Sequence, residues 1–336
     1  ASVTTRLASL VRAFRGRRVL VLADLVADEF VYGRVERISR EAPVLILRHE
    51  TSALRLGGGA NAVHNIRTLG GSPLPFGVVG RDAFGRELRR LLRAKGIEAR
   101  HVLDAPGYAT PVKTRVLAGR AHSTKQQIVR LDRVAPLAAA SPARRAVLRA
   151  LRSFRGEVHG VLVSDYGLGL LDETLVRAAV AFARRRRVPV TVDSRFGMLR
   201  FRGMTAVTPN EPEVEEALGF TIGNDRARLE RAGKLLLTRL GCRAVLVTRG
   251  SDGMALFERG RPPLHIPIYG SDEVADVTGA GDTVIATFTL ALAAGATPAE
   301  AARLANCTGG IVVMKHATAT VSAGELAAAV AEDGSR

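Results

Sequence analysis

The segment DVTGAGDTV, residues 276–284, places small residues between two acids, directly before a long apolar run. Gly279 and Gly281, with the small Ala280 between them, allow the chain to turn sharply. A helix that begins near Asp282 would present successive backbone N–H groups at its positive end, where an anion or a transferring phosphoryl group binds. A carboxylate at the same helix start can take a proton from a hydroxyl nucleophile. A plain helix cap after a glycine turn is the alternative.

A second glycine cluster, LGGGANAVHNIRTLGG, precedes another helix-like run. The bare backbone of Gly57 and Gly58 lets a ligand approach closely, and Asn61 can donate to and accept from hydroxyl groups. Asp28, just past the first apolar run, could accept hydrogen bonds from the same polyol. Together these residues indicate a sugar-like ligand, although a tight strand-to-helix connection equally explains the glycines taken separately.

A third segment, TPNEPEVEEALG, contains Asn210 and Glu213 three residues apart. Oxygen ligands of this kind could hold a hydrated Mg²⁺ through water. Much of the segment also contains ordinary start and stop signals of a helix: Pro212 at an early position, acids in the first turn and Gly219 at the end. The segment by itself leaves both interpretations open.

Short apolar runs that end in polar residues, such as VLVLAD, VLVSD and VTVD, alternate with helix-like stretches along the chain. Continuous Val and Leu runs of this length favour strands buried on both faces, as in a parallel sheet with βαβ connections. Ligands of such sheets bind outside the carboxyl ends of the strands. We therefore expect the residues that close these runs to face one shared crevice.

Two stretches, residues 30–56 and 109–132, alternate apolar and polar residues without a helical period. Each is typical of a strand pair with one face in water, and the two could form a small separate sheet. Such a sheet, from about 29–56 and 107–132, would cover the crevice as a lid. Because a partner subunit commonly covers exposed strand edges, we expect a homodimer through the lid.

The composition limits the function classes. Hydrophobic residues make up 47% and charged residues 24% of the 336 positions, as in a globular protein. The net charge of +17 could serve a nucleic acid, but the arginines are scattered and aromatic residues are few, which favours solvated arginine-rich faces. No apolar stretch is long enough to span a membrane. Cys242 and Cys307 fit no metal spacing and suggest a reducing compartment, so a cytoplasmic protein is expected.

Taken in order, these segments resemble the ribokinase-like (PfkB) family of carbohydrate kinases. The glycine-Asn segment is similar to the family's first signature, and DVTGAGDTVIATFTLALAAGA is very similar to its second. The resemblance, over roughly residues 17–330, implies an α/β fold: a ribokinase-like three-layer α/β/α sandwich with a mostly parallel central sheet and a small β-sheet lid. We expect residues 1–336 to form a single kinase domain, without a nucleotidyltransferase domain.

Within that family, segments such as YGRVERISREAPV, KTRVLAG and QQIVRLD most resemble the kinases of D-glycero-β-D-manno-heptose 7-phosphate in ADP-heptose synthesis. This resemblance implies an ATP-dependent kinase that uses Mg²⁺ and phosphorylates the anomeric C1 hydroxyl of that sugar. A monovalent cation such as K⁺ would fit the same family pattern. The implied base is Asp282, and the implied anion hole is formed by Gly279, Ala280 and Gly281.

The resemblance also assigns roles around this base. Asp28, Gly57, Gly58 and Asn61 would bind sugar hydroxyls. Our own candidates for the distal phosphate are Lys113, Arg115 and Arg130, because they are cations near a crevice lined with acids. The residues implied for ATP are Asp193, Arg195, Asn210, Glu213, Thr248, Gly250 and Asn306. Of these, Asn210 and Glu213 would organise Mg²⁺, while Asp276 and Thr278 would hold the monovalent cation.

A few positions depart from the heptose-kinase pattern. Leu168 stands where a lysine is expected, and Ser194 and Arg195 replace a Pro-Lys pair after Asp193. Arg195 can stand in for the missing lysine near the nucleotide, but Leu168 offers no charge. The acceptor could therefore be another sugar or sugar phosphate, such as a heptose isomer, ribose or fructose.

Two rivals come from other classes of protein. A nucleic-acid-binding protein on an α/β scaffold would use the basic charge and would show steeply salt-dependent binding. A regulatory sugar sensor with a dead site would share the fold without the activity. The intact Asp282 and the glycine turn before it argue against the sensor.

Overall fold

A computed structural model describes residues 3–119, 125–270 and 276–333. Within these ranges, nine strands form one sheet in the order β13-β12-β11-β10-β9-β8-β1-β4-β5. The sheet is parallel from β5 to β11, which confirms the predicted mostly parallel sheet, and β12 and β13 add an antiparallel edge. The strands are β1 (Arg18–Ala23), β4 (Ser72–Val79), β5 (Val102–Asp104), β8 (Gly160–Asp165), β9 (Val190–Ser194), β10 (Ala206–Val207), β11 (Ala244–Thr248), β12 (Met254–Glu258) and β13 (Leu264–Ile266).

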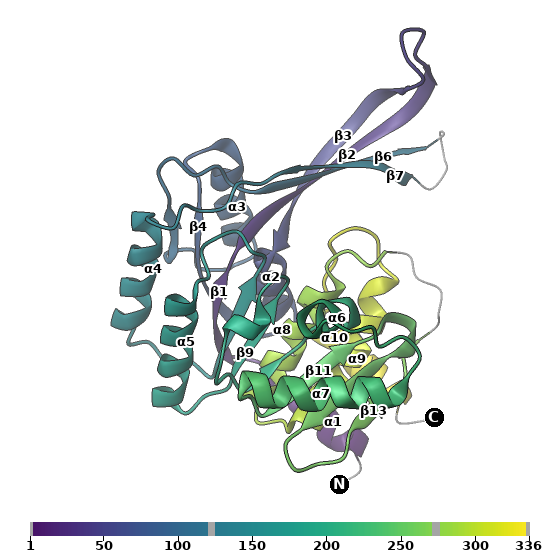
Figure 1. Ribbon diagram of the computed structural model, residues 1–336. Coiled ribbons are helices and arrows are strands. Elements are labelled where there is room, and N and C mark those ends of the chain that lie inside the picture. The colour runs from purple at the N-terminus through teal and green to yellow at the C-terminus, as the bar shows by residue number, and fades with distance from the viewer. Residues whose placement is uncertain (1–2, 120–124, 271–275, 334–336) are drawn as a thin grey trace.

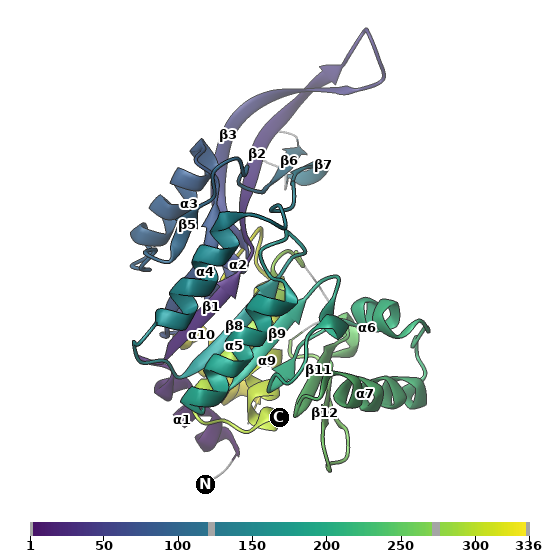
Figure 2. The same cartoon turned by 60° about the vertical axis from the view of Figure 1, so that its left-hand side comes forward.

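Alternating side chains of β1 point to opposite faces of this sheet and enter two separate cores. Val19 and Val21 join one core, while Leu20 and Leu22 join the other. Helices cover both faces, as Figures 1 and 2 show, and this confirms the three-layer α/β/α sandwich. The first core contains buried residues of α1 (Val3–Ala13), α2 (Gly59–Thr68), α3 (Ala83–Ala94), α8 (Ala280–Ala293), α9 (Pro298–Val313) and α10 (Ala323–Asp333); the second contains those of α4 (Pro142–Ser153), α5 (Glu173–Arg186), α6 (Glu211–Leu218) and α7 (Arg226–Leu240).

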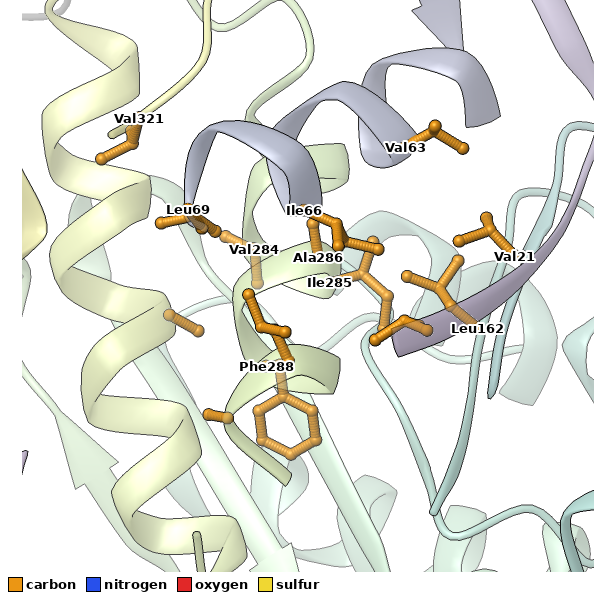
Figure 3. Close-up of a cluster of buried hydrophobic side chains, with 14 of the residues drawn as sticks. Val21, Val63, Ile66, Leu69, Leu162, Val284, Ile285, Ala286, Phe288 and Val321 are labelled. Carbon is orange, nitrogen blue, oxygen red and sulfur yellow. The ribbon is translucent and has the colours of Figure 1, made fainter. Parts of the chain in front are cut away.

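Helix α8 lies inside the first core and is apolar on nearly all sides. Val284, Ile285 and Phe288 are buried beside Val63 and Ile66 of α2, as Figure 3 shows. Full burial of one such side chain contributes about 1.5–3 kcal/mol, so several together fix the position of this helix strongly. The helix begins at Ala280, close to the predicted start, and its packing therefore holds the GAGD turn in place.

The strand order reverses at β1, which lies between β4 and β8. Ligands of open α/β sheets bind beyond the carboxyl ends of the strands at such a reversal. Asp24 follows β1 at this point and accepts hydrogen bonds from the backbone N–H groups of Tyr166 (2.9 Å) and Leu168 (3.1 Å), just beyond β8. Burial raises the pKa of Asp24 to about 7. These bonds fix the segment after β8 against the end of β1.

A second sheet of four strands projects from the sandwich, as Figures 1 and 2 show. Its order is β3-β2-β6-β7, with β2 antiparallel to β3 and parallel to β6, and with β7 antiparallel to β6. This confirms the small lid sheet; residues 120–124, between β6 and β7, lie outside the described residues. The strands are β2 (Leu25–Ile38), β3 (Leu45–Gly58), β6 (Val112–Gly119) and β7 (Gln126–Arg133).

In the described part of the chain, no helix combines the length and apolar character needed to cross a membrane. Cys242 and Cys307 are both free and buried. Two short 3₁₀ helices, Met198–Arg200 and Gly250–Asp252, follow β9 and β11 at the crevice end of the sheet. They extend the loops that carry several of the predicted site residues.

Candidate active site

Asp282 lies in the first turn of α8 and is only 3% exposed. Its Oδ1 accepts a hydrogen bond from the Tyr166 hydroxyl at 2.5 Å, and its Oδ2 accepts one from Asn61 Nδ2 at 3.1 Å. Burial raises the pKa of Asp282 to about 6, and these two hydrogen bonds oppose that rise. At neutral pH the carboxylate is therefore mostly ionised, and it retains lone pairs for a further donor.

The backbone before Asp282 makes the predicted glycine turn. Gly279 has a φ of 78°, in the left-handed region that favours glycine. The N–H of Ala280 donates to the carbonyl of Val277 at 3.2 Å, so it is not available to a ligand. No acceptor within the described ranges pairs with the N–H of Gly281 or of Asp282. Of the predicted anion-hole residues, Ala280 contributes no donor, whereas Gly281 keeps an N–H beside that of Asp282; that these amides bind a phosphoryl group stays a prediction.

Asp28 lies on β2, buried where the lid meets the sandwich. Its Oδ1 pairs with the guanidinium of Arg115 on β6 at 2.9 Å, and its Oδ2 accepts a hydrogen bond from the Thr318 hydroxyl at 2.9 Å. A Cβ at Gly57 would lie 2.5 Å from the carboxyl carbon of Asp28, so only glycine fits beside this carboxylate. Gly58 adopts a φ of 54° and precedes α2. The sugar-binding candidates therefore converge near α2, although Asp28 already has two partners.

The three lid cations differ in their surroundings. Arg115 is neutralised by Asp28, and Arg130 on β7 is exposed and pairs with Asp132 at 2.9 Å. Lys113 on β6 is half-buried, and its Nζ lies 5.2 Å from the centre of the Tyr166 ring. Lys113 thus contacts the residue that donates a hydrogen bond to Asp282.

A cavity of about 430 Å³ opens beside the start of α8. Thr248, Gly250 and Asn306 line it, and so does Gly281 of the free amide pair. Asn306 is held in place by a hydrogen bond from its Nδ2 to the carbonyl of Pro267 at 2.8 Å. The volume lies within the usual range for small-molecule pockets. The structure thus brings these three predicted ATP-site residues to the helix start that carries Asp282.

Acidic residues gather at the ends of β9 and β10. Burial and the nearby negative charge of Glu213 raise the pKa of Asp193 to about 8. Asn210 and Glu213 cap α6 reciprocally: Asn210 Oδ1 accepts from the Glu213 N–H at 2.8 Å, and Glu213 Oε2 accepts from the Asn210 N–H at 2.9 Å. Across the described residues, no group of three acids, histidines or cysteines could ligate a metal directly. The donor set fits a hydrated Mg²⁺, because a cation would relieve the repulsion between Asp193 and Glu213.

Residues 20–323 match the model of the pfkB family carbohydrate kinases. The chain belongs to this family. The fold agrees with the solved structures of two kinases. Ribokinase from Arabidopsis thaliana, in complex with ribose and ATP, has a TM-score of 0.70 and 20% identity, covering 94% of this chain and 99% of that chain. Phosphofructokinase-2 from Escherichia coli has a TM-score of 0.74 and 19% identity, covering 96% and 100%.

Curated relatives are more similar in sequence to this pfkB kinase than those two solved structures are. The bifunctional protein HldE of Caulobacter vibrioides is 42% identical over 325 residues, which cover 96% of this chain and 65% of that protein. HldE of Geobacter sulfurreducens is 41% identical over 308 residues, which cover 91% and 61%. The chain therefore spans less than two thirds of the length of these relatives.

Family membership makes this pfkB kinase a phosphotransferase with an alcohol group as acceptor. It implies ATP with Mg²⁺ as the phosphoryl donor. It also favours the kinase over the nucleic-acid-binding rival, which the basic composition alone had left open. Family membership does not determine which sugar accepts the phosphoryl group.

The predicted monovalent-cation residues lie just before α8 in this pfkB kinase. Both carboxylate oxygens of Asp276 accept backbone hydrogen bonds, one from the N–H of Thr278 at 2.8 Å and one from the N–H of Ala317 at 2.9 Å. Asp276 therefore ties the approach to α8 to the loop after α9. Its role toward K⁺ stays a prediction.

Sequence reasoning missed Tyr166 as a member of the site. Its hydroxyl donates to Asp282, and the guanidinium of Arg195 lies 4.8 Å from the centre of its ring. Burial and the negative charge of Asp282 raise the pKa of Tyr166 well above its ordinary value, so the hydroxyl remains a donor at neutral pH. The available signal was its place directly after Asp165, the residue that closes an apolar run.

Proposed function

We propose that this chain is an ATP-dependent kinase that transfers the γ-phosphoryl group of ATP to the anomeric C1 hydroxyl of D-glycero-β-D-manno-heptose 7-phosphate. The observation that carries the kinase chemistry is the start of α8, where the Asp282 carboxylate lies beside two amides that have no acceptor among the described residues. The choice of heptose rests on the lid and loop segments that resemble heptose kinases and on the bifunctional HldE relatives.

In this proposal, Asp282 accepts the proton of the attacking hydroxyl as the bond to phosphorus forms. The N–H groups of Gly281 and Asp282 stabilise negative charge on the transferring phosphoryl group, since helix N-termini favour anions. Asn61 and Tyr166 each donate a hydrogen bond to one oxygen of the carboxylate, and these bonds orient the base toward the acceptor. When bound, Mg²⁺ would neutralise phosphate charge beside Asn210 and Glu213.

The nucleotide lies, in this proposal, in the cavity lined by Thr248, Gly250 and Asn306. The acceptor lies on the opposite side of Asp282, beside Asp28 where the lid meets the sandwich. Asp28 would exchange part of its pairing with Arg115 or Thr318 for sugar hydroxyls. Asp276 and Thr278 remain our candidates for a bound K⁺.

A screen of ADP release across sugars and sugar phosphates tests the proposal. We expect turnover with the heptose 7-phosphate and much weaker turnover with ribose, fructose and the heptose without its phosphate. A preference for another sugar would replace the heptose assignment while leaving the kinase intact. ADP release with none of these acceptors would contradict the proposed function as a whole.

We also propose a homodimer through the lid. Strand β7 is exposed along its whole length, and Ile128, Val129 and Leu131 on it present apolar side chains to solvent. Such an edge is commonly covered by a second subunit. Sedimentation equilibrium should give twice the chain mass, and a monomer at all concentrations would contradict this assembly.

A further inference from the structure

Two cations from distant parts of the chain converge on one aromatic ring beside the base. Lys113 belongs to β6 of the lid, and Arg195 follows β9 of the central sheet. The Lys113 Nζ lies 5.2 Å from the centre of the Tyr166 ring, and the Arg195 Cζ lies 4.8 Å from it. Both distances are in the range in which a cation is attracted to an aromatic ring.

Neither cation has a carboxylate within ion-pair distance in the described part of the chain. Other basic residues of the lid do have such partners: Arg115 pairs with Asp28, and Lys125 pairs with Glu50. The Lys113 ammonium has no hydrogen-bond acceptor among the described residues. Within the described ranges, the Arg195 guanidinium donates only to the Tyr166 hydroxyl, at 3.5 Å.

The charges around the ring are only partly balanced. Against the opposing effect of burial, Asp282 and Asp193 raise the pKa of Arg195, and Asp28 and Asp132 lie near Lys113, but none of these carboxylates forms an ion pair with either cation in the described part of the chain. Burial lowers the pKa of Lys113, and the positive charge of Arg195 lowers it further. Two like charges gathered at a half-buried ring repel each other, and the attraction of each to the ring offsets only part of that repulsion. An anion between them would balance both charges and accept several charge-assisted hydrogen bonds.

We propose that Lys113 and Arg195 together bind one phosphate group of a substrate, above the ring of Tyr166. Because the Tyr166 hydroxyl donates to Asp282 at 2.5 Å, this phosphate would lie close to the reacting centre. Leu168, two residues after Tyr166, offers no charge here, so the lid and the loop after β9 supply it instead. The anion site stands on geometry alone, whereas its assignment to a sugar phosphate rests on the proposed function.

Binding of inorganic phosphate tests the site without any turnover. Calorimetric titration of the full chain, at constant ionic strength against chloride, should show binding that weakens about tenfold or more in Lys113→Met and in Arg195→Met. Lys113→Arg keeps the charge and should retain most of the affinity. Arg185→Met, which removes an exposed arginine in the last turn of α5, is the matched control and should bind as the wild type does.

Two results would overturn the site. One is a wild-type protein that shows no binding of phosphate at millimolar concentrations. The other is a pair of variants, Lys113→Met and Arg195→Met, that bind phosphate as tightly as the Arg185→Met control does. Unchanged melting temperatures would show that any loss of binding is local.

Kinetics distinguish the two sources of the phosphate. If the acceptor supplies it, both variants raise the KM for the sugar phosphate about tenfold and leave the KM for ATP and for the unphosphorylated sugar nearly unchanged. If ATP supplies it, the KM for ATP or the kcat changes with every acceptor. Phosphate binding that depends on both cations, in a protein that turns over no sugar, would uphold this site and refute the proposed function.

Discussion

The residues on the two sides of Asp282 differ in chemical character. The cavity proposed for the nucleotide is lined by glycines, apolar side chains and small polar groups, and none of the described residues that line it is charged. The proposed acceptor side holds Asp28, Arg115 and Lys113, all charged, with Arg195 beside Lys113 at the Tyr166 ring. In the proposed function, one side would therefore recognise its ligand by shape and backbone, and the other would recognise its ligand by charge.

The two sides also differ in which parts of the chain build them. The cavity is formed by the sandwich and by the segments around α8 and α9. The proposed acceptor side takes Asp28 and Arg115 from lid strands β2 and β6, which project from the sandwich in Figure 1. Changes on the cavity side should therefore alter nucleotide kinetics alone, whereas changes around Tyr166 should alter acceptor kinetics and the base.

The largest effect is expected at Asp282, which serves both sides. Asp282→Asn keeps the size of the side chain but removes its capacity to accept a proton. We expect kcat to fall by about 10²–10⁴-fold while the protein folds and binds ATP normally. Single-turnover kinetics and a separate ATP titration measure the two properties. Near-normal turnover would remove Asp282 from the role of base.

A smaller effect, confined to the nucleotide side, is expected at Val277. This residue lines the cavity and is 69% exposed, so substitution should not disturb the core. Val277→Glu places a negative charge near the nucleotide phosphates and should raise the KM for ATP about five- to tenfold. Val277→Gln is the uncharged control. An equal rise in the KM for the acceptor would contradict the functional separation of the two sides.

The smallest effect is expected from Tyr166→Phe, which removes one hydrogen bond to Asp282. That bond lowers the pKa of Asp282, so its loss should move the acid limb of the pH–rate profile to higher pH. The accompanying fall in kcat should be about three- to tenfold, in keeping with one hydrogen bond. The remaining ring should preserve the affinity of the acceptor phosphate. An unshifted acid limb would show that Tyr166 does not tune the base.

Much of the fold was predictable from local pattern. The apolar runs that close at Asp165 and Asp193 became parallel strands, and the alternating stretches became the lid, because burial on both faces or on one face leaves a direct mark on the sequence. The antiparallel edge formed by β12 and β13 was not among the predicted strands. Both strands are short, and β13, the edge strand, is only partly buried, so neither leaves a long pattern in the sequence.

The site was predictable where neighbours in sequence act together, as in the GAGD turn and in the capping pair of Asn210 and Glu213. It was not predictable where the partners come from different elements. Asn61 and Tyr166 lie 221 and 116 residues from Asp282, and no local pattern records which of its oxygens each one binds. The pairing of Arg115 with Asp28, which neutralises one of the proposed phosphate ligands, is likewise visible only in three dimensions.

The pH dependence of kcat/KM for the wild type tests the central claim most directly, because burial raises the pKa of Asp282 to about 6. The base works only when ionised, so kcat/KM should be level above about pH 7 and should fall about tenfold for each pH unit well below pH 6. Asp282→Asn should lose this acid limb. A wild-type profile that stays flat down to about pH 5, or an acid limb that persists in Asp282→Asn, would contradict the account.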